Sequence, residues 1–176
     1  MRLAAPMLFL GFALAAAVPA QADTRPDYEA AIAAIKQGKR DQAIALLTKV
    51  IDSKELSGET LATMHYMRAD LYGQLAKLDE SVADYSKAIE IMPDHAAAFH
   101  DRAVVYAQQK KYTEALDDLA RAQFLVPNSP LPYFNRGRVY ETMGKRNEAI
   151  QEYRKARALA PKMKEPREAL RRLGVR

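Results

Sequence analysis

Residues 130–163 read PLPYFNRGRVYETMGKRNEAIQEYRKARALAPKM, and this stretch of 34 residues carries the clearest pattern in the chain. Apolar and small residues recur in it at helical spacing in two blocks, which are separated by the short polar segment Gly144-Lys145-Arg146. Pro161 closes the second block, because proline cannot donate an interior hydrogen bond and disfavours helix in the residue before it. The stretch therefore predicts a helical hairpin.

The same pattern recurs upstream with a period of 34 residues. Alignment on the recurring proline superimposes four sets of residues: Pro93, Pro127 and Pro161; Tyr72, Tyr106 and Tyr140; Tyr85, Leu119 and Tyr153; and Ala88, Ala122 and Ala156. Self-similarity at a fixed period of this size is typical of a solenoid of stacked supersecondary units. The sequence thus predicts tandem helical hairpins at residues 62–95, 96–129 and 130–163.

These units resemble the tetratricopeptide repeat (TPR) family, whose pattern has small residues at positions 8, 20 and 27, aromatic residues near 4, 11 and 24, and proline at 32. The matches in residues 130–163 are Tyr133, Gly137, Tyr140, Ala149, Tyr153, Ala156 and Pro161. A degenerate first unit fits at about 24–57, and four extra residues separate it from the second unit. Residues at about 164–174 are predicted to form a capping helix. The resemblance implies an all-α fold, a right-handed α-solenoid of TPR hairpins with a C-terminal cap.

The first 22 residues have the features of a signal peptide. Arg2 supplies a positive start, an apolar stretch runs from Met7 to Val18, and Ala20-Gln21-Ala22 offers a small-x-small cleavage pattern. We expect cleavage after Ala22, which leaves residues 23–176 as the TPR domain. Because the apolar stretch is shorter than the roughly 20 residues that span a bilayer, we expect no stable membrane insertion after cleavage. The predicted localisation is the bacterial periplasm.

The composition limits the chemistry that we expect of the chain. It has 32 alanines and no cysteine, which excludes a disulfide framework and a cysteine metal site. The three histidines, His65, His95 and His100, stand outside any metal-binding or catalytic motif. We therefore predict no enzymatic activity, no catalytic residue, no metal and no cofactor. Nucleic acid is not an expected partner, because the chain is predicted to be exported and has no reading motif.

One charged pair repeats with the hairpins. Arginine occupies position 7 in three units, and an acidic residue occupies position 23 of the same units: Arg68 with Asp84, Arg102 with Asp118, and Arg136 with Glu152. The first unit lacks both, with Ala30 and Leu46 in their places. Joint presence and joint absence suggest that the two residues contact each other, because an unpaired buried charge is costly. The alternative is an arginine row that binds an anionic ligand.

The resemblance also implies a binding surface. In the TPR family the first helix of each hairpin lines a concave groove, with positions 2, 5, 9 and 12 pointing inward. This phase predicts a partner-binding groove of eight residues: Tyr28, Tyr66, Asp70, His100, Val104, Phe134, Arg138 and Glu141. Four of them are rings at position 5, which could grip a peptide by apolar contact or could pack only against the next hairpin. Some TPR domains bind the C-terminal carboxylate of a peptide with a lysine at position 5 and an asparagine at position 9. This chain has neither residue at those positions, so we do not expect that activity.

Charge is unevenly distributed along the chain. Residues 23–129 contain 13 bases and 17 acids, whereas residues 130–176 contain 13 bases and five acids. The predicted basic docking surface consists of Arg154, Lys155, Arg157, Lys162, Lys164, Arg167, Arg171 and Arg172; the alternative is a solvated face.

We predict a periplasmic adaptor or scaffold that binds a peptide or partner domain in its groove. The alternative is an accessory subunit of a cell-wall or secretion complex that docks through its convex face and basic end.

Overall fold

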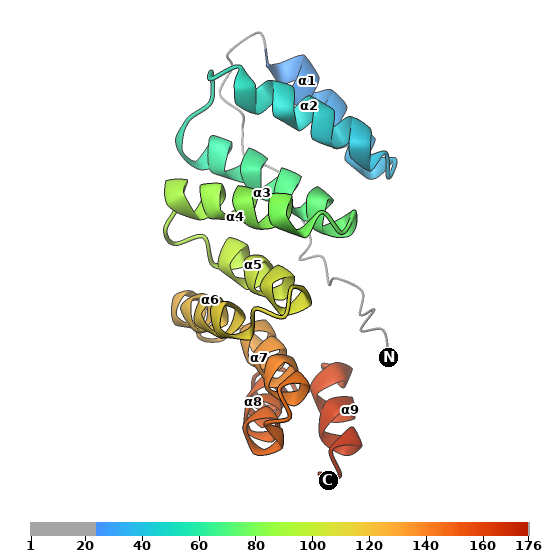
Figure 1. Ribbon diagram of the computed structural model, residues 1–176, viewed down its shortest axis with the longest axis vertical. Coiled ribbons are helices and arrows are strands. Elements are labelled where there is room, and N and C mark those ends of the chain that lie inside the picture. Colours follow the sequence, from blue (N-terminus) through green and yellow to red (C-terminus); the bar gives the residue numbers. More distant parts are fainter. Residues whose placement is uncertain (1–23, 176) are drawn as a thin grey trace.

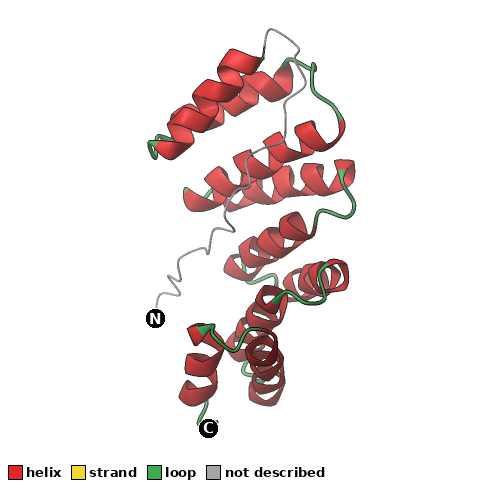
Figure 2. Ribbon diagram, turned by 180° about the vertical axis from the view of Figure 1, so that it is seen from behind, coloured by secondary structure: helices red, strands yellow, loops and turns green. Residues whose placement is uncertain are grey.

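The computed structural model describes residues 24–175, so the predicted signal peptide lies outside the described residues. The helices of this part of the chain are α1 (Arg25–Lys36), α2 (Arg40–Asp52), α3 (Gly58–Gln74), α4 (Leu78–Ile91), α5 (Ala96–Gln108), α6 (Tyr112–Leu125), α7 (Pro130–Thr142), α8 (Arg146–Leu159) and α9 (Lys164–Arg172). Residues 24–175 contain no strand, and only loops join the helices in Figure 2. The predicted all-α solenoid is confirmed.

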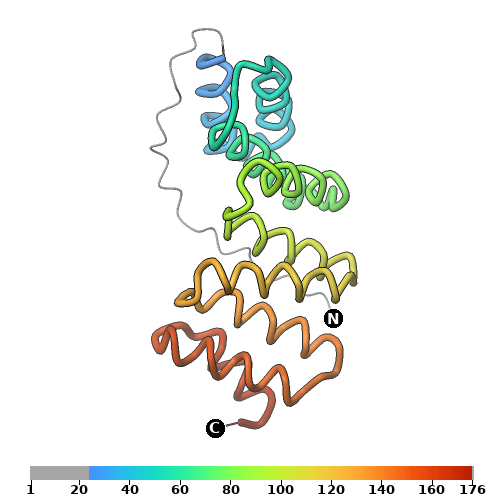
Figure 3. Tube along the Cα trace, turned by 90° about the vertical axis from the view of Figure 1, so that its left-hand side faces the viewer, coloured from blue at the N-terminus to red at the C-terminus, as the bar shows by residue number. Residues whose placement is uncertain are grey.

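The helices pair into four antiparallel hairpins that follow one another along the molecule, and α9 closes the row (Figure 1). Within each hairpin the first helix packs on the second, and the second helix packs on the first helix of the next hairpin. Figure 3 shows the same succession from the side. Each hairpin therefore contacts mainly its neighbours along the chain, as expected for a solenoid.

Contacts between alternate helices show which side of the stack is the inner one. The first helices of successive hairpins touch, α3 with α5 and α5 with α7. No contact of similar extent joins α4 to α6 or α6 to α8 within residues 24–175. The stack therefore curves toward its first helices, and we call the surface formed by α1, α3, α5 and α7 the inner face.

The turn inside each hairpin has one conformation throughout. The residue at position 15 has a left-handed backbone in all four turns: φ is 71° at Gly38, 57° at Ala76, 63° at Lys110 and 75° at Gly144. The next residue is always a lysine, and its N–H closes the preceding helix, as in the bond from Lys77 N to the Tyr72 carbonyl at 2.9 Å. The four hairpins therefore share one turn geometry.

Small residues at position 8 allow the two helices of a hairpin to approach closely. Ala69 and Ala103 are completely buried, and Gly137 is buried at the same place in the fourth hairpin. A Cβ atom at Gly137 would lie 2.5 Å from the ring of Tyr153, which is far inside van der Waals contact. The sequence pattern of small and large residues is therefore a pattern of close packing.

The first hairpin joins the stack through α2. Ala31, Leu47 and Val50 share one apolar core with Met64 and other α3 residues, and α2 contacts α3. The four residues that separate the first unit from the second form no extra loop, because α3 begins at Gly58 and runs for 17 residues. The extra residues thus lengthen α3 at its N-terminus, and α1 makes no contact with α3 comparable to that between α3 and α5.

The last helix covers the end of the stack. Ala169 and Leu170 on α9 are buried against Ala149, Ile150 and Tyr153 of α8. The remaining α9 surface carries exposed charged residues. Within residues 24–175, no helix combines the length and apolar character that a membrane crossing requires.

Candidate functional site

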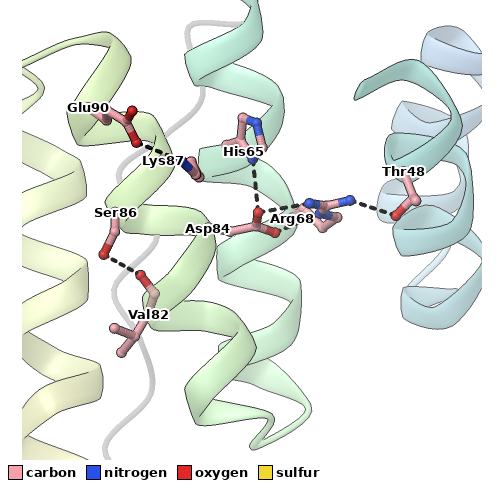
Figure 4. Close-up of polar contacts among 8 residues, drawn as sticks. All are labelled: Thr48, His65, Arg68, Val82, Asp84, Ser86, Lys87 and Glu90. Atoms are coloured by element: carbon pink, nitrogen blue, oxygen red, sulfur yellow. Dashed lines mark hydrogen bonds and ion pairs between the residues drawn. The ribbon is translucent and has the colours of Figure 1, made fainter. Parts of the chain in front are cut away.

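The repeated arginine connects three helices. In Figure 4, Arg68 of α3 reaches Asp84 on α4 and Thr48 on α2. Its Nε and Nη2 donate to the two Asp84 oxygens at 2.6 and 2.8 Å, and Nη1 donates to Thr48 Oγ1 at 2.8 Å. His65 Nδ1 lies 2.9 Å from the same carboxylate. These bonds hold the pKa of Asp84 below its usual value despite its burial.

The same arrangement recurs one hairpin later and weakens in the next. Arg102 makes a bidentate pair with Asp118, at 2.7 and 2.8 Å, and bonds Ser86 of the preceding hairpin at 2.9 Å. Arg136 lies 3.9 Å from Glu152 and donates instead to Gln123 at 2.6 Å. The predicted contact between positions 7 and 23 is confirmed within the second, third and fourth hairpins. A separate hydrogen bond from the same arginine joins each of these hairpins to the preceding one.

The predicted groove residues lie on the inner face, and all eight are half-buried. Tyr66 packs between Tyr85, with ring centroids 5.6 Å apart, and His95, at 4.9 Å. Phe134 packs on Tyr153 at 5.6 Å, while Tyr28 borders the core of the first hairpin. The rings are therefore anchored in the fold and still retain some exposed surface.

A chain of hydrogen bonds runs along the inner face across three hairpins. Tyr66 Oη donates to Asp101 Oδ2 at 2.6 Å, and His100 Nδ1 lies 2.8 Å from Asp101 Oδ1. The Asn135 amide lies 2.7 Å from His100 Nε2, and Arg138 Nη1 donates to Asn135 at 3.4 Å. A neutral His100 that donates from Nδ1 accepts at Nε2. Position 5 of one hairpin thus bonds position 6 of the next.

Asp70 adds a second carboxylate beside this chain. It accepts a hydrogen bond from Gln74 at 2.9 Å, and Arg40 of the first hairpin donates to the same Gln74 at 2.7 Å. Burial, and then the negative charge of Asp101, raise the pKa of Asp70 to about 6. The inner face is therefore acidic between α3 and α5.

The fourth hairpin uses one predicted groove residue to hold the cap. Glu141 accepts a hydrogen bond from Tyr153 Oη at 2.7 Å and two from Arg172 of α9, at 3.0 and 2.8 Å. The Arg172 bonds hold the pKa of Glu141 below its usual value. Nearby, the Arg138 guanidinium lies 6.0 Å from the centre of the Phe134 ring. Glu141 thus joins three helices, whereas Val104 and Arg138 remain half-buried on the inner face.

The predicted basic surface spans α8 and α9. Seven of its eight residues are exposed, and Arg157 is half-buried. Arg172 is paired with Glu141, and Lys155 lies 3.2 Å from Glu152, so these two cations are partly neutralised. Lys164, Arg167 and Arg171 line a hollow on α9 together with Glu168. Residues 24–175 hold no cluster of three or more potential metal-binding side chains.

Sequence reasoning missed several residues of this network. Asp101 and Asn135 occupy position 6, directly after the predicted rings, and Thr48 and Ser86 occupy position 25. The 34-residue alignment contained the relevant signal, because residues 35 apart, such as Tyr66 and Asp101, belong to neighbouring hairpins. A search for complementary polar residues at position 5 of one hairpin and position 6 of the next, rather than within one hairpin, would have found Asp101 and Asn135.

Comparison with protein families identifies the repeat. Models described as tetratricopeptide repeat match residues 27–53, 66–130 and 130–163, which together cover most of the chain. The chain belongs to the tetratricopeptide repeat family. The TPR match includes the first hairpin, whose sequence departs furthest from the pattern. Among curated proteins, no sequence matches.

Solved TPR structures share the fold. MamA from Desulfovibrio magneticus RS-1 matches with a TM-score of 0.77 and 17% identity, over 86% of this chain and 83% of that one. YrrB, described as a TPR protein with an unusual peptide-binding site, matches with a TM-score of 0.76 and 17% identity, over 85% and 75%. The first TPR of Spaghetti (RPAP3), bound to the HSP90 peptide SRMEEVD, matches with a TM-score of 0.64 and 24% identity, over 67% and 94%.

Proposed function

We propose that the protein is a non-enzymatic adaptor that binds a peptide or a partner domain on its inner face. The observation that carries the proposal is the row of half-buried side chains from successive hairpins, in which Tyr66, His100 and Phe134 are held by contacts with neighbouring residues. Rings held in this way lose little conformational entropy when a ligand binds. TPR proteins generally act as non-catalytic interaction modules, and two of the similar structures are described by their peptide sites.

Site-specific photo-crosslinking in the native cell envelope tests the proposal. One variant carries a photoreactive residue in place of Val104 on the inner face, and a matched variant carries it in place of Ala120, which is exposed on α6. We expect a discrete crosslinked partner from position 104 and none from position 120. Crosslinks from position 120 alone would reject the inner face as the binding surface.

The proposed location is the bacterial periplasm, after cleavage of residues 1–22. The support is the charged start, apolar stretch and small-x-small pattern of the sequence. Cell fractionation followed by mass spectrometry of the intact protein tests it, with an expected N-terminus at Asp23. A cytoplasmic protein that retains residues 1–22 would contradict the proposal.

The basic end supports a second candidate, an accessory subunit that docks through its convex face and α9. The favouring observation is the exposed cations of α8 and α9, among which Lys164, Arg167 and Arg171 border one hollow. A photoreactive residue in place of Glu168 would then capture the partner. Replacement of the three cations by glutamate should abolish that crosslink, whereas it should leave a crosslink from position 104 intact.

A further inference from the structure

Two inner-face carboxylates at the junction of the second and third hairpins form no ion pair with a lysine or arginine among the described residues. Asp70 lies on α3 and Asp101 on α5, and the charge of Asp101 raises the pKa of Asp70. Neither has a lysine or arginine nitrogen within 4.0 Å among the described residues. Their hydrogen bonds come from Gln74, Tyr66 and His100. Histidine is therefore the one basic side chain that bonds either carboxylate among the described residues, while the charge of Arg40 acts on Asp70 from beyond ion-pair distance.

A buried hydroxyl at the same junction also lacks a partner. Tyr85 is completely buried, and its Oη makes no hydrogen bond to any residue between 24 and 175. Its ring lies 5.6 Å from the ring of Tyr66, whose hydroxyl donates to Asp101, so Tyr85 belongs to the same junction. Burial, and then the charges of Asp101 and Asp70, raise the pKa of Tyr85. An unpaired buried hydroxyl is costly.

The fourth hairpin shows what is missing beside Tyr85. Tyr153 occupies the same position 24 and donates to Glu141, which occupies position 12 on the inner face. In the second hairpin position 12 is Gly73, which has no side chain. By analogy with Tyr153, we expect the Tyr85 hydroxyl to point toward the inner face, where the described residues supply no hydrogen-bond partner.

We propose that Asp70, Asp101 and Tyr85 form a subsite for a lysine or arginine side chain of the segment bound on the inner face. An ammonium or guanidinium group carries several N–H donors and one positive charge, which matches two carboxylates and a hydroxyl. Because Tyr85 Oη is screened from solvent, binding must open its surroundings, and Tyr66 is the neighbouring ring. This inference rests on the proposed function and specifies the chemistry of the partner.

Peptide binding to the purified protein tests the subsite. The probes are nonapeptides with acetylated N-termini, amidated C-termini and randomised flanks, whose central residue is lysine, arginine, glutamine or glutamate. We expect lysine and arginine peptides to bind at least tenfold more tightly than their glutamine counterparts. The double variant Asp70→Asn/Asp101→Asn should lose this preference. The control Asp94→Asn/Asp117→Asn removes two exposed carboxylates elsewhere and should keep it.

Tyr85→Phe separates a binding role of the hydroxyl from a structural one. The variant should fold with unchanged or higher stability, because it removes an unpaired polar atom, and should bind lysine peptides several-fold more weakly. Tyr153→Phe is the matched control: it loses the bond to Glu141 and should lower stability without changing affinity. Unchanged affinity in Tyr85→Phe would remove the hydroxyl from the subsite and overturn the proposal as stated.

The peptide-binding experiment distinguishes failure of the proposed inner-face function from failure of the proposed subsite. If no peptide binds, whatever its central residue, both the inner-face function and the subsite are rejected. If peptides bind without preference for a central base, or if the preference persists in Asp70→Asn/Asp101→Asn, the subsite alone is rejected.

Discussion

Single arginines set the register between hairpins. Arg68 and Arg102 each bind a carboxylate on their own hairpin and a hydroxyl on the preceding one. Arg136 lacks this hydroxyl, because Ala120 stands where Thr48 and Ser86 stand in earlier hairpins. In addition, Arg136 Nε and Glu152 Oε2 have no hydrogen-bond partner among the described residues. The same arginine therefore stabilises the three junctions to different extents.

Arg102→Ala should cost about 3 kcal/mol of unfolding free energy, because it leaves Asp118 buried without its bidentate partner. Arg136→Ala should cost only about 1 kcal/mol, since its ion pair is longer and incomplete. Urea denaturation measures both, with exposed Arg121→Ala as the control. If Arg102→Ala kept full stability but lost partner binding, the arginine row would belong to the ligand site instead.

Asp70 should make stability depend on pH. Its pKa is raised from 3.8 to about 6 by burial and by Asp101, while Gln74 and Arg40 oppose the shift. The folded state then binds the Asp70 proton more readily than the unfolded chain, so this contribution destabilises the fold as pH rises from about 4 to 6.

Asp70→Asn removes this titration. Relative to wild type, the variant should therefore gain about 2 kcal/mol of unfolding free energy between pH 4 and pH 7. Denaturation across this range measures the gain, and direct titration of the Asp70 carboxyl by NMR locates its pKa. The exposed control Asp94→Asn should show no such trend. A constant difference between Asp70→Asn and wild type would contradict the assignment.

At the scale of the element, the hairpin turn is the most regular feature. Four turns share a left-handed residue at position 15, but only Gly38 and Gly144 are glycines there. Ala76 and Lys110 hold the same conformation with a Cβ atom, which strains the backbone of an L-residue. The turn geometry is therefore imposed by the packing of the two helices rather than by the local sequence alone.

Ala76→Gly and Lys110→Gly should each stabilise the protein by about 0.5 to 1 kcal/mol, because relief of the strain outweighs the added freedom of the unfolded chain. Gly144→Ala should destabilise it by about 1 kcal/mol for the reverse reason. Lys110→Ala separates the loss of the lysine side chain from the change in backbone. Destabilisation by both glycine variants, measured by thermal denaturation, would show that the turns carry no strain.

For the whole molecule, stability should vary along the stack. Each hairpin contacts mainly its neighbours, so a defect at one end affects distant hairpins weakly. Leu170 is 1% exposed and seals the apolar surface of α8. The cap is thus a local determinant of stability.

Leu170→Ala should cost about 2 to 4 kcal/mol at the C-terminal end. Hydrogen exchange measures where this loss falls, and we expect amides of α7 and α8 to lose protection while those of α3 and α4 keep most of theirs. Leu47→Ala, in the core of the first hairpin, is the matched defect at the other end. Equal loss of protection throughout the chain in both variants would indicate a single cooperative unit.

The sequence predicted the fold because its period of 34 recurs in proline, tyrosine and alanine together. It also predicted the pairs of Arg68 with Asp84 and Arg102 with Asp118, since both partners lie in one hairpin and appear or vanish jointly. Contacts between hairpins were harder to foresee: the hydrogen bond of Tyr66 with Asp101 joins different positions of two units, and the bond of Glu141 with Arg172 involves the cap, outside the period. Whether the predicted groove residues bind a partner stays a prediction.

The junction between α4 and α5 has a use in protein engineering. Residues 78–111 form a 34-residue cassette that contains Asp84, Ser86 and Arg102, and its ends fall at the same point of two successive turns. An additional cassette inserted after Lys111 would pair the original Arg102 with the new Asp84, and the new Arg102 with Ser86 of its own cassette and with Asp118. Serial insertion of the cassette would thus yield solenoids of chosen length, in which every added junction between hairpins contains the same arginine, aspartate and serine contacts.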